Sequence, residues 1–328
     1  MKLMSKLLTI TETATWLSER DNFLIITHKR PDGDTLGSGG ALAMALQTQG
    51  KTAYLLHNKE TTQRYERFVK DLWVPDNFTP KYIIAVDTAS VDLFPENASA
   101  YNERIDLCID HHPSNKEYSK FLCLEAHQAS CGEVVYDILT EMKININTDI
   151  ADLLYIAIST DTGCFAYSNT TSNSLLTASK LIEAGANNIE INKCLFRTKT
   201  QSRIKLEGMI TSTMEFFFDG SVAIAVITRE MMDKTKSTED DIDDIAAIPT
   251  SVEGVLVGIT IRELTSPQDC KISVRSSAPF NANELCMHFG GGGHIRASGA
   301  SVEKTVNEIK DELLIVLEDM VERNTNSR

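Results

Sequence analysis

The sequence lacks the features that mark membrane, disulfide-stabilised and zinc-ribbon proteins. No run of eighteen apolar residues occurs, so no transmembrane helix is expected. The seven cysteines are odd in number and form no C-x-x-C pair, which argues against disulfide frameworks and zinc ribbons. The apolar stretch at the N-terminus is short and soon interrupted, unlike a secretory signal. These absences together predict a cytoplasmic protein with reduced thiols.

Positive charge is also scarce, and this shortage limits the partners. Lysine and arginine number 32 against 46 aspartates and glutamates, which gives a formal net charge of −14. A protein that grips long nucleic acid normally carries a basic stripe, because neutralising phosphates supplies most of the affinity. We therefore expect no long nucleic acid and no membrane as partner, but a small phosphate-bearing substrate. The oligomeric state stays open, a homodimer included.

Short apolar runs separated by helical patterns predict an α/β fold in the first part of the chain. Continuous apolar strands are typical of a parallel sheet buried on both faces, whose ligands bind at the carboxyl ends of the strands. The predicted strands are 23–27, 52–57, 82–86 and 105–109. The predicted helices are 9–20, 36–49, 133–142, 150–159 and 172–184.

The pattern changes near residues 188–215, and the length of 328 residues favours two domains. A polar helical stretch over 189–214 is expected to connect them. Strands are then predicted at 215–219, 222–228, 255–262 and 271–277, with helices at 281–288 and 305–321. The predicted organisation is a catalytic domain at 1–187, a helical linker at 188–214 and a smaller α/β domain at 215–328, with a cleft between the domains.

The strongest chemical signal is the loop that begins at His28 and contains Asp32 and Asp34. Carboxylates two residues apart point in opposite directions on extended backbone, so each could serve a different metal ion. The alternative is a turn in which an aspartate caps the following helix.

Three further signals follow predicted apolar elements. They are Asp87 after a strand, the triplet Asp110, His111 and His112 after the next, and Asp161 where an apolar helix meets a glycine turn. For Asp87 the alternative is a capping or turn role, and for the triplet it is a surface loop with two solvated histidines. Within the triplet, one imidazole can bind metal while the other faces substrate, and Asp110 can orient an imidazole. Gathered at one sheet edge, these carboxylates and imidazoles predict two divalent ions, and the mixed ligands favour Mn²⁺ over Mg²⁺.

The order H-x-x-x-D-x-D, V-D, D-H-H and S-T-D-T-G resembles the DHH phosphoesterase family. The later stretch His288–Gly299, with four glycines before His294, resembles the glycine-rich motif of the DHH-associated domain. The compact layout is similar to that of nano-RNases that also act as phosphatases on 3′-phosphoadenosine 5′-phosphate. The resemblance therefore implies a phosphoesterase that cleaves short oligoribonucleotides of 2–5 nucleotides, 3′-phosphoadenosine 5′-phosphate, or both.

The resemblance also implies roles for individual residues. One metal would be held by His28, Asp32 and Asp87, and the other by Asp34, Asp87, His111 and Asp161, with Asp87 bridging. His112 would lie near the scissile phosphate as substrate ligand or acid. No side-chain nucleophile is required, because paired metal ions can activate water.

Substrate binding is expected in the second domain. Gly291, Gly292 and Gly293 offer backbone amides that no Cβ obstructs, a suitable nest for phosphate oxygens. His294 and Arg275, the latter followed by Ser276, are candidates to bind a second phosphate, so that a short substrate would span the cleft.

The loop after Asp161 departs from the family pattern, because the arginine expected there is absent. We expect Tyr167 to stack on a base instead. Three other functions stay open: a cyclic-di-AMP phosphodiesterase, a family II inorganic pyrophosphatase, and a catalytically inert nucleotide-binding regulator.

Overall fold

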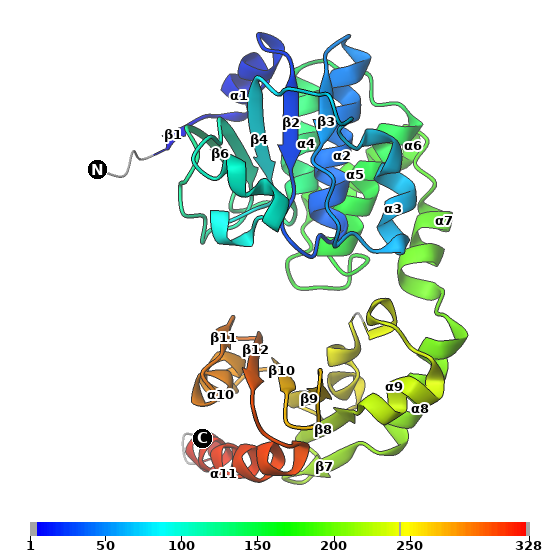
Figure 1. Ribbon diagram of the computed structural model, residues 1–328, viewed down its shortest axis with the longest axis vertical. Helices are drawn as coiled ribbons and strands as arrows, with labels where there is room; N and C mark the ends of the chain where they lie inside the picture. Colours follow the sequence, from blue (N-terminus) through cyan, green and yellow to red (C-terminus); the bar gives the residue numbers. More distant parts are fainter. Residues whose placement is uncertain (1–4, 243, 326–328) are drawn as a thin grey trace. The chain divides into compact units, whose positions relative to one another are not determined.

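The computed structural model describes residues 5–242 and 244–325, which form two compact units divided between Thr198 and Lys199 (Figure 1). Unit 1 is the part up to Thr198, and unit 2 is the part from Lys199. Within the described ranges, no helix combines the length and apolarity needed to cross a bilayer.

Unit 1 is built on a six-stranded sheet in the order β1-β6-β5-β4-β2-β3, and every neighbouring pair is parallel. The strands are β1 (Lys6–Leu7), β2 (Phe23–Ile26), β3 (Ala53–Leu55), β4 (Tyr82–Val86), β5 (Leu107–Asp110) and β6 (Phe121–Leu124). The strands β2, β4 and β5 are central, so their carboxyl ends meet at one edge of the sheet. This confirms the predicted parallel sheet, to which β1 and β6 add two strands that were not predicted.

The α-helices of unit 1 contribute to the core on one face of this sheet. They are α1 (Ile10–Ser18), α2 (Gly33–Thr48), α3 (Gln63–Val69), α4 (Cys131–Glu141), α5 (Thr148–Asp161), α6 (Ser172–Glu183) and α7 (Asn188–Asn192). Shorter turns are η1 (Lys70–Leu72), η2 (Val91–Leu93), η3 (Glu96–Tyr101) and the π-helical η4 (Lys193–Arg197). Figure 1 shows α2, α4 and α5 side by side along the sheet.

Both faces of the sheet are buried, but by different kinds of element. Phe23 and Ile25 of β2 pack into a core shared with α1, α2, α4 and α5. Leu24 and Ile26, which point to the other face, pack into a core that contains Ala98 of η3. The strands are therefore apolar throughout, because each face meets its own hydrophobic core.

Unit 2 contains a second six-stranded sheet in the order β11-β12-β10-β9-β8-β7, antiparallel except for the parallel pair β8 and β9. Its strands are β7 (Glu215–Phe217), β8 (Val222–Ile227), β9 (Val257–Glu263), β10 (Cys270–Ser276), β11 (Gly292–Gly293) and β12 (Ala297–Val302). Its helices are α8 (Gln201–Ser212), α9 (Arg229–Thr235), α10 (Ala282–His288) and α11 (Val306–Thr325), with turns η5 (Glu239–Ile242), η6 (Ile245–Ala247) and η7 (Pro249–Ser251).

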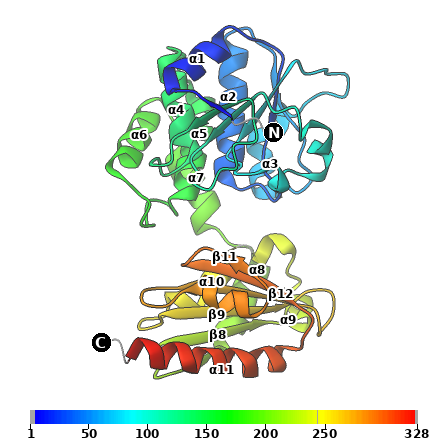
Figure 2. The same cartoon turned by 90° about the vertical axis from the view of Figure 1, so that its left-hand side faces the viewer.

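One core of unit 2 lies between this sheet and the helices α10 and α11. Figure 2 shows α11 running along the sheet. Leu313 and Leu317 of α11 are fully buried there. Strand β12 was not predicted, because its sequence is rich in small residues and has no apolar run.

The connector expected as one helix over 189–214 is divided in the structure. Ile191 of α7 and Leu195 of η4 are buried in the core of unit 1. Leu206 and Ile210 of α8 are buried in unit 2. The two halves carry separate apolar faces, and the chain between η4 and α8 is extended at Thr198 and Thr200.

Candidate metal centre

Asp87 stands directly after β4 and is almost completely buried. Its backbone has φ of 50°, in the left-handed region that aspartate and asparagine tolerate better than most residues. Its backbone amide donates to the carbonyl of Ile109 on β5, at 2.9 Å. The strand end and this turn together hold the carboxylate at the carboxyl edge of the sheet.

Asp34 reaches the same place from a helix, which corrects the extended geometry expected for the pair Asp32 and Asp34. Helix α2 begins at Gly33, because the side chain of Asp32 caps it by accepting from the amides of Asp34 and Thr35. Asp34 is buried, and its oxygens accept from the amides of Cys131, at 2.7 Å, and Gly132, at 2.9 Å. The capping alternative is therefore true of Asp32, and α2 aims Asp34 at the start of α4.

His28 lies between Asp32 and Asp87. Its Nε2 is 3.5 Å from Asp32 Oδ1 and 3.7 Å from Asp87 Oδ2. Its Nδ1 lies 2.8 Å from the carbonyl oxygen of Lys29, which only accepts, so Nδ1 carries a proton. In the neutral ring, Nε2 then presents its lone pair to the two carboxylates.

His111 has the same arrangement around a second set of carboxylates. Its Nε2 lies 3.7 Å from Asp34 Oδ2, 3.4 Å from Asp87 Oδ1 and 3.6 Å from Asp161 Oδ2. Its Nδ1 faces the carbonyl oxygen of Gln128 at 3.2 Å. Asp161 is the last residue of α5, so four elements converge on this ring.

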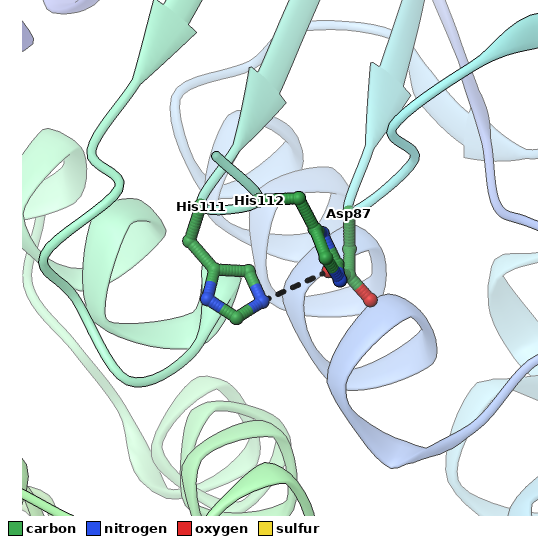
Figure 3. A group of neighbouring side chains, drawn as sticks. All are labelled: Asp87, His111 and His112. Carbon is green, nitrogen blue, oxygen red and sulfur yellow. Dashed lines mark ion pairs between the residues drawn. The ribbon is translucent and has the colours of Figure 1, made fainter. Parts of the chain in front are cut away.

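His112 differs from its neighbour in the partner of Nδ1. Both rings lie beside Asp87 (Figure 3). However, His112 Nδ1 is 2.8 Å from Asp110 Oδ1 and 3.5 Å from Asp87 Oδ1. Asp110 is fully buried and also accepts from the backbone amides of His111 and His112. The Nδ1 atom of His112 is therefore held by the Asp110 carboxylate, and Nε2 is the ring nitrogen that does not contact Asp110.

Several carboxylates are buried close together, and both burial and their mutual repulsion disfavour the charged forms. Burial, together with the charge of Asp161, raises the pKa of Asp34 to about 7. Burial and the charges of Asp34 and Asp32 raise the pKa of Asp87 well above its ordinary value. Burial disfavours a charged His28 ring, but Asp32 and Asp87 outweigh it and raise the pKa of His28 to about 9. The cluster as a whole needs positive charge, from protons or from cations.

The residues present fit divalent metal ions. Asp87 Oδ1 is buried and has no hydrogen-bond partner among the described residues, which is costly for a carboxylate unless a cation contacts it. Three groups have ligand atoms within 4.8 Å of one another: His28 with Asp32 and Asp87; Asp34 with His111 and Asp161; and Asp87 with His111 and His112. Hard carboxylates mixed with imidazoles suit first-row divalent metals.

In the glycine-rich segment of unit 2, several of the amides expected to bind phosphate already have acceptors within the unit. The amides of Gly290 and Gly291 donate to the carbonyls of Met287 and Cys286, and the amide of Gly293 donates to Asn283 Oδ1, at 2.9 Å. A Cβ on Gly291 would come within 2.2 Å of Gly299 O. Close pairing of β11 with β12 is what demands glycine at position 291, and these amides are already used.

Three side chains assigned to substrate binding also lie in unit 2. Ser276 is buried, and its hydroxyl faces the carbonyls of Phe280 and Ile295, each at 3.1 Å. Arg275 is half-buried, and its Nη1 donates to the carbonyl of Val274. His294 is exposed. Of these side chains, His294 and Arg275 have the exposure that a substrate contact requires.

Sequence reasoning missed the residues that hold the ligands in place. Asn115 donates to Asp110 Oδ2 at 2.6 Å, and Ser38 donates to Asp34 Oδ1 at 2.9 Å. Gln128 supplies the carbonyl that faces His111. Ser38 stands four residues after Asp34 on α2, a spacing that could have identified it. No pattern marks Gln128, because its role depends on a backbone carbonyl.

Known proteins resemble this chain over most of its length. The "Bifunctional oligoribonuclease and PAP phosphatase NrnA" of Thermus thermophilus is 28% identical over 301 residues, covering 88% of this chain and 89% of that protein. The protein of the same name from Bacillus subtilis is 27% identical over 299 residues, covering 89% and 93%. A solved structure, an exopolyphosphatase-related protein from Bacteroides fragilis, has a TM-score of 0.86 at 25% identity and covers 95% of this chain and 97% of its own.

Two family descriptions match the two units in turn. "DHH family, N-terminal domain" matches residues 22–158, which include every candidate metal ligand except Asp161. "DHHA1 domain" matches residues 219–323, which include the glycine-rich segment. The chain therefore contains an N-terminal DHH domain followed by a DHHA1 domain.

Proposed function

We propose that this protein is a divalent-metal phosphoesterase that hydrolyses short oligoribonucleotides and 3′-phosphoadenosine 5′-phosphate. The observation that carries the proposal is the convergence of His28, His111 and His112 on the buried carboxylate of Asp87. The names of the relatives, oligoribonuclease and PAP phosphatase, support this choice of substrates.

Two metal ions would be held by two overlapping sets of residues. One set is His28, Asp32 and Asp87, and the other is Asp34, Asp87, His111 and Asp161, with one oxygen of Asp87 for each set. When bound, such ions neutralise phosphate charge and lower the pKa of a coordinated water. We assign Mn²⁺ to this site, because two imidazoles favour a later metal than Mg²⁺.

His112 acts on the substrate rather than on the metals. Its Nδ1–H donates to Asp110, which fixes the ring and directs Nε2 away from that carboxylate. From that position Nε2 binds the scissile phosphate and supplies the proton that the leaving oxygen requires. Asp110 stabilises the charged ring, as its effect on the pKa of His112 indicates: the hydrogen bond to Asp110 raises that pKa.

In unit 2, His294 and Arg275 are the side chains that we assign to substrate binding. Both supply donors for a further phosphate group, and neither depends on the amides that the glycine segment uses internally. A net charge of −14 gives a long strand little to hold along its backbone, so short substrates are preferred. All seven cysteines are free thiols, which suits a cytoplasmic enzyme.

A substrate panel tests this function. Purified protein with Mn²⁺ is assayed on RNA of two, five and about twenty nucleotides, on 3′-phosphoadenosine 5′-phosphate, on cyclic di-AMP and on pyrophosphate. We expect the highest kcat/KM on the dinucleotide or on 3′-phosphoadenosine 5′-phosphate, with a fall as the strand lengthens. Fastest cleavage of the long strand, of cyclic di-AMP or of pyrophosphate would contradict the proposal.

A further inference from the structure

Asn115 closes the turn that follows the two histidines. Its backbone amide donates to the carbonyl of His112, at 3.0 Å. Its side-chain Oδ1 accepts from the amide of Glu117, at 2.8 Å. These two bonds explain an asparagine in a turn, and a purely local role would need nothing more.

The amide nitrogen of the Asn115 side chain contacts a residue outside this turn. Nδ2 of Asn115 donates to Asp110 Oδ2 at 2.6 Å, its shortest contact, and also lies 3.4 Å from the carbonyl of Thr88. The opposite oxygen, Asp110 Oδ1, accepts from His112 Nδ1. The three side chains therefore form one chain of hydrogen bonds from Asn115 through Asp110 to His112.

The hydrogen bond from Asn115 matters because Asp110 is buried. Asp110 is fully buried, so water does not hold its carboxylate. Oδ1 has three donors, namely the amides of His111 and His112 and the ring of His112. A carboxylate held at one oxygen can still rotate about its Cβ–Cγ bond, whereas a donor on each oxygen fixes its plane. Asn115 is the donor on Oδ2.

We propose that Asn115 is a positioning residue for the reaction: by fixing Asp110, it holds the His112 ring with Nε2 directed at the substrate. This inference rests on the proposed function. Asn115 touches neither His28, Asp34 nor Asp161 in any hydrogen bond of the described residues, so its effect falls on the leaving group rather than on metal binding.

The two roles of Asn115 can be separated by substitution. Asn115→Asp keeps an oxygen that accepts from Glu117, so the turn is preserved, but it replaces the donor to Asp110 with a second carboxylate. Asn115→Ala removes both bonds. A turn residue would tolerate the aspartate and not the alanine. A positioning residue would lose its function in both.

The experiment compares two substrates at pH 8 with Mn²⁺. One is the dinucleotide pApA, whose leaving sugar oxygen needs a proton, and the other is the p-nitrophenyl ester of adenosine 5′-phosphate, whose leaving group departs without one. For Asn115→Asp we expect kcat on pApA to fall about 10–100-fold, the usual effect of losing an outer hydrogen-bond partner. We expect KM, bound Mn²⁺ and the rate on the nitrophenyl ester to stay within about 3-fold.

Tyr118→Phe is the matched control. Its hydroxyl donates to the carbonyl of Thr88, at 2.7 Å, in the same buried region, but has no hydrogen bond to Asp110. It should leave both rates near those of the wild type. An Asn115→Asp enzyme with normal rates on pApA would overturn the inference, and so would equal losses on both esters or a loss of Mn²⁺. A wild-type enzyme that cleaves neither ester would instead refute the proposed function.

Discussion

The metal centre of unit 1 and the glycine-rich segment of unit 2 both stood out in the sequence, yet the structure treats them differently. In unit 1, side chains from separate elements face each other across less than 4 Å, and Asp87 Oδ1 has no hydrogen-bond partner among the described residues. In unit 2, the amides of Gly290, Gly291 and Gly293 are paired within the unit. An unsatisfied buried oxygen therefore distinguishes the candidate metal centre, whereas close packing against Gly299 explains the glycine at position 291.

The largest effect that this comparison predicts is at Asp87. Asp87→Asn keeps the size of the side chain and tolerates a φ of 50°, whereas alanine adds backbone strain of about 1–2 kcal/mol. We expect the asparagine variant to fold, to bind less Mn²⁺ and to lose activity by about 10³-fold or more, a loss of roughly 4 kcal/mol in transition-state stabilisation. Elemental analysis and initial rates check this. Near-normal rates would show that Asp87 is not shared between the metals.

A smaller effect is expected at the exposed side chains of unit 2. His294→Ala and Arg275→Ala should each weaken the binding of short substrates by about 1–3 kcal/mol, the range for hydrogen bonds to a charged group. Because both residues lie outside unit 1, bound Mn²⁺ should not change. Kinetic titration with pApA measures the first quantity and elemental analysis the second. If KM and kcat were unchanged in both variants, His294 and Arg275 would not take part in substrate binding.

Two neighbouring glycines sharpen the contrast between packing and binding. A Cβ at Gly291 would meet Gly299 O and Ala300, so Gly291→Ala should destabilise unit 2 by about 1–3 kcal/mol. A Cβ at Gly292 would come no nearer than 3.7 Å, to Asn283 Oδ1, so Gly292→Ala should be almost neutral. Urea unfolding compares the two variants. If both variants were equally stable and lost equal substrate affinity, the glycine segment would be a phosphate-binding site rather than a packing feature.

The smallest effect concerns metal removal and pH. Asp34 has an ordinary pKa of 3.8 and a folded pKa of about 7, so stability is lost as pH rises through that interval. The pKa of His28 rises from 6.5 to about 9 on folding. Its contribution to stability is therefore complete below pH 6.5 and is lost as pH rises through 9. Metal-free protein should therefore have a lower Tm at pH 9 than at pH 6, by the order of 2–4 °C.

The metal-loaded protein is the control for that comparison, because it shares every titratable group outside the site. Its Tm should change less over the same pH range, since bound cations replace the protons that the cluster otherwise holds. Differential scanning calorimetry measures both forms. A metal-free Tm that rises from pH 6 to pH 9, relative to the loaded form, would contradict the assigned electrostatics.

The sequence predicted the parallel sheet because the strands of unit 1 are apolar on both faces, and it predicted which side chains gather because they follow strand ends. It could not predict how they are held. Asp34 was expected on extended backbone, but capping by Asp32 starts α2 earlier and turns Asp34 toward α4. Likewise, the amides of Gly290, Gly291 and Gly293 donate to residues of α10, and small residues give no sequence signal of these contacts.

The family resemblance implied different roles for His111 and His112, but the sequence did not show how the two rings are held. The two rings are adjacent, and only the partner of Nδ1 separates them: a backbone carbonyl for His111 and the Asp110 carboxylate for His112. Backbone carbonyls carry no sequence signal, so only the structure shows that the Nδ1 atoms of the two rings have different partners.

The central claim is that Asp87 joins two metal sites, and diffraction from crystals soaked in Mn²⁺, recorded at the manganese absorption edge, tests it most directly. The account predicts two anomalous peaks about 3.5–4 Å apart, the spacing of two-metal sites. One peak should touch His28 and Asp32, the other Asp34, His111 and Asp161, and both should touch Asp87. A single peak, or a peak bound to His112 Nδ1 in place of Asp110, would contradict the account.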